Sequence, residues 1–240
     1  MYLEQLINTL KNKGAYKIVF LGDSITSAEW VHPNWRDAVE YVLKIELSEK
    51  LNDWNLPSWG IRCINSGFDG ATTRDWLSKI KTDVLDYKPD MVIVMGTIND
   101  MNLKIPSDET KNNIEQLLNA LTSNVTSVIY STDLVTNNND YNQKYQEYLS
   151  KVTSLFPRNN ILFINMYEEF KKLDLNKFFT FESIGNDVVG IKQGDLDFIH
   201  PNQLGNAYIA KIILDKVFNI KFDPEKYIQE NNEGKMFPNY

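Results

Sequence analysis

A serine, an aspartate and a histidine in this sequence have the local settings that nucleophilic catalysis requires. Ser24 follows an apolar run, Val19–Leu21, and stands in the segment Gly22-Asp23-Ser24. A glycine at the end of a predicted strand permits a tight turn, and a helix start nearby would place backbone N–H groups beside the hydroxyl. The tripeptide by itself is more often a turn or a helix cap. Ser24 is therefore a candidate nucleophile only if the chain also supplies a base.

The chain contains two histidines, His32 and His200. A serine hydroxyl is hardly ionised at neutral pH, so it needs a general base, normally histidine. Asp197 precedes His200 by three residues, a spacing at which an acid can orient the imidazole, and this spacing favours it over Asp195. The alternative for His200 is a cap or an exposed loop residue. His32 has only Glu29 at a comparable distance, which favours a structural or pocket-rim role.

Two turns after predicted strands offer hydrogen-bond donors for a developing oxyanion. Residues 65–73 read Asn-Ser-Gly-Phe-Asp-Gly-Ala-Thr-Thr, in which the Gly70 N–H lies just before the next predicted helix. Residues 95–100 read Met-Gly-Thr-Ile-Asn-Asp, in which Asn99 carries a side-chain amide. Such turns are common in α/β sheets, so neither is specific alone. Together with the serine and histidine segments, they are expected to meet at one edge of a sheet.

These four segments, in this order, resemble the four sequence blocks of the SGNH (GDSL-type) hydrolases. The segments are Gly22-Asp23-Ser24, Asn65 to Thr72 with its Asn-x-Gly-x-x-Gly-x-Thr pattern, Gly96 to Asp100, and Asp197-x-x-His200-Pro201-Asn202. The resemblance extends from residue 18 to about residue 215. The first and last segments are the specific ones, and the middle two support them.

The resemblance implies a role for each candidate residue. Ser24 would be the nucleophile, His200 the general base and acid, and Asp197 the group that orients the imidazole. The oxyanion hole would combine the backbone N–H groups of Ser24 and Gly70 with the side chain of Asn99. No organic cofactor and no metal are implied.

The third segment departs from the family pattern Gly-x-Asn-Asp. Thr97 and Ile98 separate Gly96 from Asn99. Either the turn carries one extra residue or Thr97 occupies the usual glycine position.

Five short apolar runs predict the strands of a sheet. Most are continuous rather than alternating, as expected for parallel strands buried on both faces. They are Ile18–Leu21, Cys63–Asn65 with its flank, Met91–Met95, Val128–Tyr130 and Ile161–Ile164.

Helical spacing of apolar residues predicts helices between these strands. They cover 3–10, 35–51, 73–80, 108–121 with Ser107 as N-cap, 141–155, and 201–218 with Pro201 in the first turn. The alternation predicts a three-layer α/β/α fold with a five-stranded parallel sheet of the flavodoxin-like, SGNH hydrolase type. Such sheets carry their sites at the carboxyl ends of the strands.

Length and composition limit the alternatives. The chain has 240 residues, with 25 Lys plus Arg against 32 Asp plus Glu, a net charge of −7. This balance argues against nucleic acid as a main partner. We expect one domain over residues 1–220, a polar C-terminal tail over 221–240, and a loop over 177–199.

The single cysteine, Cys63, excludes an intrachain disulfide and is expected to be a buried apolar side chain. We find neither a signal-peptide pattern nor an apolar run of the roughly 20 residues that a membrane span needs. A cytoplasmic location is therefore the expectation.

We expect serine-dependent hydrolysis of a carboxylic ester through an acyl-enzyme, with a small-molecule ester as substrate. Aromatic and amide side chains near the predicted site favour a short acyl group, such as acetyl, on a carbohydrate or other polar alcohol. These side chains are Trp30, Trp35, Phe68, Trp76 and Asn102. The alternatives are a lysophospholipase or thioesterase, and a non-catalytic module that binds a carbohydrate or a phosphate.

Overall fold

The computed structural model describes residues 2–52, 60–185 and 189–240, and within them one five-stranded sheet. All neighbouring strands pair in parallel, in the order β2-β1-β3-β4-β5. The predicted fold class and strand number are confirmed. The strands are β1 (Tyr16–Gly22), β2 (Ile61–Gly67), β3 (Met91–Met95), β4 (Ser127–Ser131) and β5 (Ile161–Ile164).

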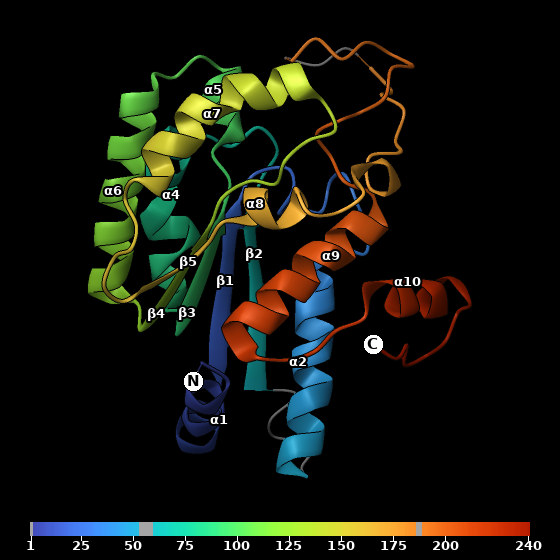
Figure 1. The fold of residues 1–240 in the computed structure, drawn as a ribbon. Helices are drawn as coiled ribbons and strands as arrows, with labels where there is room; N and C mark the ends of the chain where they lie inside the picture. The colour runs from blue at the N-terminus through green and yellow to red at the C-terminus, as the bar shows by residue number, and fades with distance from the viewer. Residues whose placement is uncertain (1, 53–59, 186–188) are drawn as a thin grey trace.

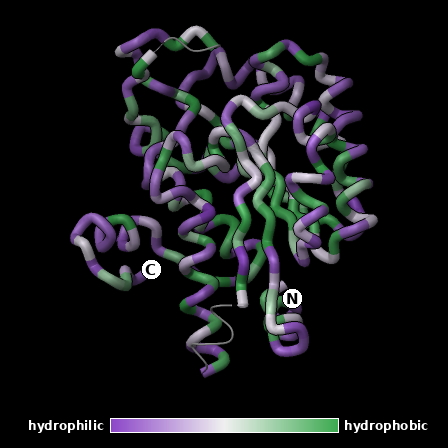
Figure 2. Tube along the Cα trace, turned by 180° about the vertical axis from the view of Figure 1, so that it is seen from behind, coloured by the Kyte–Doolittle hydropathy of each residue, from purple (hydrophilic) through white to green (hydrophobic). Residues whose placement is uncertain are grey.

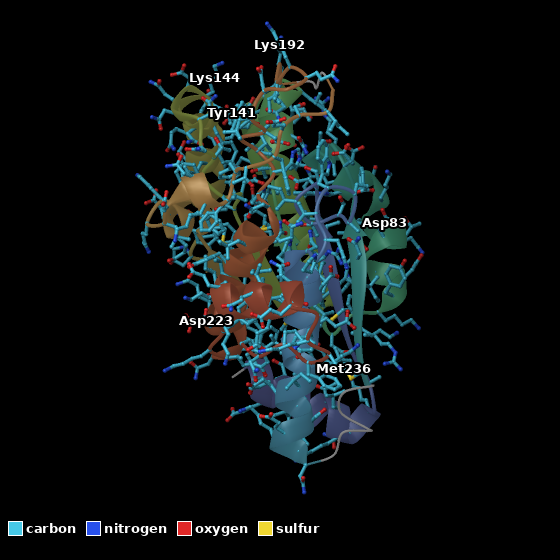
Figure 3. The ribbon with its side chains drawn as sticks, turned by 90° about the vertical axis from the view of Figure 1, so that its right-hand side faces the viewer. Asp83, Tyr141, Lys144, Lys192, Asp223 and Met236 are labelled. Atoms are coloured by element: carbon cyan, nitrogen blue, oxygen red, sulfur yellow. The ribbon has the colours of Figure 1, made fainter. Side chains whose placement is uncertain are left out.

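Helices cover both faces of the sheet (Figures 1 and 3). One face is covered by α1 (Tyr2–Lys13), α2 (Trp35–Leu51), α8 (Met166–Phe170), α9 (Gln203–Ile213) and its continuation η3 (Leu214–Phe218). The other is covered by α4 (Thr73–Asp83) and α6 (Ser107–Asn124), while α7 (Asn139–Thr153) contributes to both cores. The short elements are η1 (Leu85–Tyr87), α5 (Ile98–Asn102) and η2 (Leu175–Lys177). Nowhere in the described ranges is a helix long and apolar enough to cross a bilayer.

The strand residues divide between two hydrophobic cores because successive side chains point to opposite faces. In β1, Ile18 and Phe20 join the core under α2 and α9, whereas Val19 and Leu21 join the core under α4 and α6. Phe20 meets the buried ring of Trp35 edge to face, with 5.1 Å between centroids. The central strands accordingly form the apolar middle of the molecule (Figure 2).

The register brings the carboxyl ends of neighbouring strands together. Gly22 at the end of β1 is paired with Gly67 of β2 and with Met95 of β3, and Met95 is paired with Ser131 of β4. The turns that follow these strands therefore emerge at the same edge of the sheet, as a parallel sheet requires. This edge carries the candidate site.

Several predicted helix starts differ from the structure by one or two residues; α7, for example, begins at Asn139 rather than at Tyr141. Ser107 is the first residue of α6 rather than its N-cap, and its hydroxyl donates to Glu147 at 2.5 Å. The helix predicted over 201–218 begins two residues later, as α9. Pro201 lies outside it because the side chain of Asn202 accepts from the N–H of Gly205 and caps the helix. An asparagine with this geometry is among the strongest N-caps.

The C-terminal segment, predicted as a polar tail over residues 221–240, contains a helix and packs against the body of the protein. It forms α10 (Pro224–Asn232), which Asp223 caps, and Tyr227 of this helix is buried. Tyr41 of α2 donates its hydroxyl to the carbonyl of Pro238 at 2.8 Å. Asp223 and Met236 mark this segment in Figure 3.

Candidate active site

Ser24 lies in the turn that follows β1. A Cβ added to Gly22 would lie 2.2 Å from Thr26 Oγ1 and 2.8 Å from the Met95 carbonyl oxygen, so only glycine fits at this position. The N–H groups of Thr26 and Ser27 both donate to the Asp23 carbonyl, at 3.0 and 2.9 Å. The chain thus turns tightly around Ser24, directly after the end of β1.

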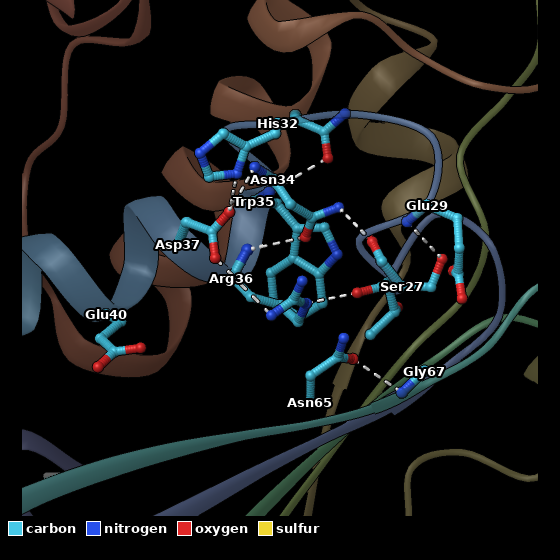
Figure 4. A network of polar contacts seen from close by, with 12 residues as sticks. Ser27, Glu29, His32, Asn34, Trp35, Arg36, Asp37, Glu40, Asn65 and Gly67 are labelled. Carbon is cyan, nitrogen blue, oxygen red and sulfur yellow. Dashed lines mark hydrogen bonds and ion pairs between the residues drawn. The ribbon is translucent and has the colours of Figure 1, made fainter.

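The segment from Ser24 to α2 is held by polar contacts with its own backbone (Figure 4). The Asn34 amide donates to the carbonyls of Ile25 and Ser27 at 3.0 and 3.1 Å, while its oxygen caps α2. The Arg36 guanidinium donates to the Thr26 carbonyl. These bonds tie the serine turn to a long helix and fix its position.

His200 is within hydrogen-bond distance of both other predicted members of a Ser-His-Asp set. Its Nε2 lies 2.9 Å from Ser24 Oγ, and its Nδ1 lies 2.7 Å from Asp197 Oδ2. The second carboxylate oxygen of Asp197 accepts from the N–H groups of Ile199 and His200, at 2.8 and 3.0 Å. The three side chains, 176 residues apart at the extremes, therefore form one buried chain of hydrogen bonds.

The Asp197 carboxylate is stabilised in its charged form. Burial by itself raises the pKa of Asp197, but the hydrogen bond and charge of His200 and the two backbone N–H donors outweigh burial, and the pKa lies below its ordinary value. Asp197 also donates its own N–H to the Phe181 carbonyl at 2.8 Å, within a short antiparallel contact between Glu182 and Leu196. An ionised, anchored Asp197 can hold the imidazole in one orientation.

Asn206 of α9 fixes the His200 segment against α2. Its amide donates to the Pro201 carbonyl at 2.9 Å, and its oxygen accepts from the N–H of Trp35 at 3.2 Å. The helix that follows His200 and the helix that follows Ser24 are therefore joined by one buried side chain.

The three predicted oxyanion donors follow strands that end at the same edge of the sheet. They are the backbone N–H groups of Ser24 and Gly70 and the side-chain amide of Asn99. Within the described ranges, the N–H groups of Ser24 and Gly70 donate to no protein acceptor. Gly70 adopts φ +68°, a conformation that favours glycine. Asn99 Nδ2 donates one N–H to the carbonyl of Ala71 at 3.2 Å, which places the amide beside the Gly70 turn.

Asp100 connects the elements around Asn99, a function that the sequence analysis did not assign. Its carboxylate accepts from the N–H and hydroxyl of Thr73, at 2.8 and 2.5 Å, and from the hydroxyl of Thr110 at 2.7 Å. These contacts join α5 to the starts of α4 and α6. The dipeptide Asn99-Asp100 therefore combines a candidate donor with the residue that anchors its helix.

The departure from the family pattern falls at the turn between β3 and α5, which contains Gly96 and Thr97, and at Ile98, the first residue of α5. Gly96 has φ +137°, and an added Cβ would lie 2.9 Å from Asp23 Oδ2 and 3.0 Å from the Trp76 ring. Thr97 follows as the N-cap residue of α5, which begins at Ile98. Gly96 is thus required by close packing against the serine turn, and Asn99 stands one residue into the helix.

Trp30 covers one face of the His200 imidazole. The two rings are stacked, with 3.9 Å between centroids and 5° between planes. The indole N–H donates to Asp69 Oδ1 at 3.0 Å, and the Trp30 side chain remains 40% exposed. Trp30 therefore links the histidine to the turn that carries Gly70.

Other residues expected near the site differ in their placement. Trp35 and Trp76 are buried in the two cores rather than at the site edge, and Trp76 donates its indole N–H to the Gly22 carbonyl at 3.2 Å. Asn102 does lie beside the site, since its amide donates to Asn99 Oδ1 at 3.3 Å. The partly buried ring of Phe68 lies under the ammonium group of Lys79, at 4.1 Å from its centroid.

His32, the alternative to His200 as base, and Asp195, the alternative to Asp197, each contact other residues. The His32 side chain is 81% exposed and its Nδ1 lies 3.3 Å from Asp37 Oδ2. Asp195 accepts from the N–H of Lys192 at 3.2 Å. Across the part of the chain that the structure describes, no group of three or more His, Cys, Asp or Glu side chains could hold a metal ion.

A parallel α/β/α sheet with a serine, a histidine and an aspartate in hydrogen-bond contact at its carboxyl edge is an arrangement of hydrolases. A family model described as "GDSL-like Lipase/Acylhydrolase family" matches residues 20–208. The chain belongs to this family, and the resemblance seen in its sequence is confirmed.

Two curated proteins are similar over part of the sequence. An acetylxylan esterase of Geobacillus stearothermophilus is 33% identical over 93 residues, or 35% of this chain and 40% of that protein. An uncharacterised lipoprotein of Bacillus subtilis (strain 168) is 30% identical over 91 residues, or 38% of this chain and 34% of that protein. The chain thus matches less than half the length of either relative.

Solved structures with the same fold cover most of the chain. The lipase/acylhydrolase of Enterococcus faecalis has a TM-score of 0.65 and 23% identity, covering 84% of this chain and 95% of that one. The Geobacillus stearothermophilus acetylxylan esterase has a TM-score of 0.62 and 22% identity, covering 87% and 95%. At this identity the likeness concerns the fold.

Proposed function

We propose that this protein hydrolyses carboxylic esters through an acyl-enzyme on Ser24. Membership of a lipase/acylhydrolase family supports ester hydrolysis in general. The observation that carries the specific proposal is the hydrogen-bonded chain from Ser24 Oγ through His200 to Asp197, with contacts of 2.9 and 2.7 Å. At 2.9 Å, His200 Nε2 is close enough to accept the proton of Ser24 Oγ, and at 2.7 Å Asp197 can orient the imidazole.

The proposed reaction has two steps that use the same imidazole. His200 Nε2 takes the Ser24 proton as Oγ bonds to the ester carbonyl carbon, and it then gives the proton to the departing alcohol. Water attacks the acyl-enzyme after losing a proton to Nε2, and the acid leaves as that proton returns to Oγ. Asp197 keeps Nδ1 protonated and stabilises the imidazolium that forms in both steps.

Three N–H groups are proposed to bind the negative charge that develops on the carbonyl oxygen. The Ser24 and Gly70 backbone groups have no described protein acceptor, and Asn99 has a second amide hydrogen beyond the one that Ala71 accepts. Donors held ready for the oxyanion stabilise the transition state because they need no reorganisation during the reaction.

We further propose a short acyl group, such as acetyl, on a carbohydrate or a similar polar alcohol. The hollow beside Ser24 is too narrow to admit a water-sized sphere, so it offers no channel for a long acyl chain. Ser24 and His200 contribute polar groups to its lining, and the exposed ring of Trp30 lies beside them. The partial match to an acetylxylan esterase supports the same substrate class.

A panel of esters tests the proposal on the wild-type protein, Ser24→Ala and the control Ser78→Ala, which changes an exposed serine on α4. We expect wild type and Ser78→Ala to hydrolyse p-nitrophenyl acetate and acetylated xylooligosaccharides, and Ser24→Ala to lose several orders of magnitude in kcat. A Ser24→Ala protein as active as wild type would refute the nucleophile. A steep rise in kcat/KM from acetyl to octanoyl esters would refute the short acyl group and favour a lysophospholipase or thioesterase.

A further inference from the structure

Two carboxylate oxygens buried beside the serine turn have no hydrogen-bond donor. They are Asp23 Oδ2 and Asp133 Oδ1, which accept no bond from any residue that the structure describes. Both side chains are only 1% exposed. An ionised oxygen buried without a donor is costly, so both oxygens require an explanation.

The other oxygen of each carboxylate is well satisfied. Asp23 Oδ1 accepts from the N–H of Ile25 at 3.0 Å, within the serine turn. Asp133 Oδ2 accepts from the N–H of Ile98 at 2.9 Å and from the hydroxyl of Tyr145 at 2.8 Å, with the Thr97 hydroxyl at 3.4 Å. Asp23 is thus part of the nucleophile's turn, whereas Asp133, which follows β4, contacts the start of α5, the helix that carries Asn99.

Both carboxyl groups lie against the turn between β3 and α5. Asp23 Oδ2 lies against Gly96, and Asp133 contacts the next two residues along the chain. Burial first, and then the charge of Asp133, raises the pKa of Asp23 well above its ordinary value. The titratable groups that face the pair from neighbouring elements are acids and phenols. Besides burial, the charge of Asp69 raises the pKa of Asp23 and that of Asp100 raises the pKa of Asp133, whereas the Tyr145 hydroxyl donates to Asp133 and lowers its pKa. Besides burial, the charges of Asp133 and Asp23 in turn raise the pKa of Tyr130.

We propose that Asp23 and Asp133 share one proton, in an O–H···O bond that ties the Ser24 turn to the start of α5 and so positions Ser24 relative to Asn99. One proton turns two donorless acceptors into a donor and an acceptor, and it removes one of two like charges. Three donors to Asp133 favour its ionised form, so the proton lies on Asp23. Both are positioning residues, because the predicted reacting groups lie on the neighbouring Ser24 and Asn99.

Asparagine substitutions separate this bond from a merely structural role. Asp23→Asn keeps an oxygen for Ile25 and supplies a permanent N–H to Asp133, so we expect kcat within about threefold of wild type. Asp133→Asn supplies an N–H from the opposite side. In the double variant two N–H groups face each other, and we expect kcat at least about fivefold below the product of the single effects. The exposed Asp86→Asn serves as control. A double variant whose loss of kcat equals the product of the two single-variant losses would overturn the proposal.

Infrared spectroscopy tests the proton itself without relying on the proposed esterase activity. At pH 7 the wild type and the inactive Ser24→Ala protein should show the carbonyl stretch of a buried carboxylic acid, and either single asparagine variant should lose it. Asp86→Asn should keep it. A spectrum in which Asp23→Asn and wild type have the same band would overturn the shared proton. A failed esterase assay alongside the expected band would refute only the proposed function on which the kinetic arm rests.

Discussion

Replacing Asp197 by asparagine changes one charge and one hydrogen-bond donor while keeping the shape of the side chain. In the wild type, Oδ1 accepts from two backbone N–H groups and Oδ2 accepts from His200 Nδ1 at 2.7 Å. An asparagine can keep its oxygen toward the backbone, which leaves its NH₂ group facing Nδ1. The imidazole must then carry its proton on Nε2, where it donates to Ser24 instead of accepting from it.

We expect Asp197→Asn to lower kcat by about 10⁴-fold, or about 5.5 kcal/mol of transition-state stabilisation, with little change in KM. Steady-state hydrolysis of p-nitrophenyl acetate measures both constants. Asp195→Asn, two residues earlier in the chain, is the matched control and should retain wild-type kinetics because its carboxylate accepts from Lys192 N–H. A loss of less than tenfold in Asp197→Asn, or an equal loss in the control, would refute the reasoning.

Three further predictions concern Asn99, Trp30 and Asp133. Asn99→Ala should lower kcat about 10²–10³-fold with little change in KM, as loss of one oxyanion donor does, and an unchanged kcat would exclude it from the oxyanion hole. Trp30→Ala removes the ring stacked on His200 and the bond to Asp69, so we expect a two- to tenfold loss in kcat. Trp30→Phe keeps an aromatic ring and should lose less; an equal loss of kcat in the two variants would count against the stacking. Burial raises the pKa of Asp133 to about 6, against the hydrogen bonds from Tyr145 and Ile98. The folded protein therefore holds a second proton, on Asp133 and in addition to the one proposed on Asp23, more tightly than the unfolded chain does, and stability falls as pH rises from about 4 to 6. Urea unfolding should show the wild type losing stability relative to Asp133→Asn across that interval, and a constant difference would contradict this sign.

The sequence predicted the fold and the serine, histidine and aspartate because their signals are local. A continuous apolar run such as Met91–Met95 reports a strand buried on both faces, and it forms β3 with those bounds. The three-residue spacing of Asp197 and His200 likewise predicted a contact within one turn, and the structure places their side chains 2.7 Å apart. Their roles in catalysis stay a prediction.

Features that depend on distant partners could not be read from local patterns. Asp100 has the composition of an ordinary turn residue, and its role arises from Thr73, which lies 27 residues away in the chain. Asp133 meets the start of α5 from 35 residues away. Trp76 resembled a site aromatic by its position after the Gly70 turn, yet it is buried because α4 directs it into the core.

The C-terminal helix was missed for a different reason. Its nine residues bury few side chains, so the helical spacing of apolar residues is too short to stand out. The signals for a helix start there are the N-cap Asp223 and Pro224 directly after it.

Covalent labelling of Ser24 tests the central claim most directly. A fluorophosphonate reacts with a serine that a neighbouring base activates, and mass spectrometry identifies the modified peptide. The account predicts one adduct per chain on the peptide that contains Ser24, loss of ester hydrolysis in proportion to labelling, and no adduct in Ser24→Ala. A wild-type protein that stays unlabelled, or a Ser24→Ala protein labelled to the same extent, would contradict it.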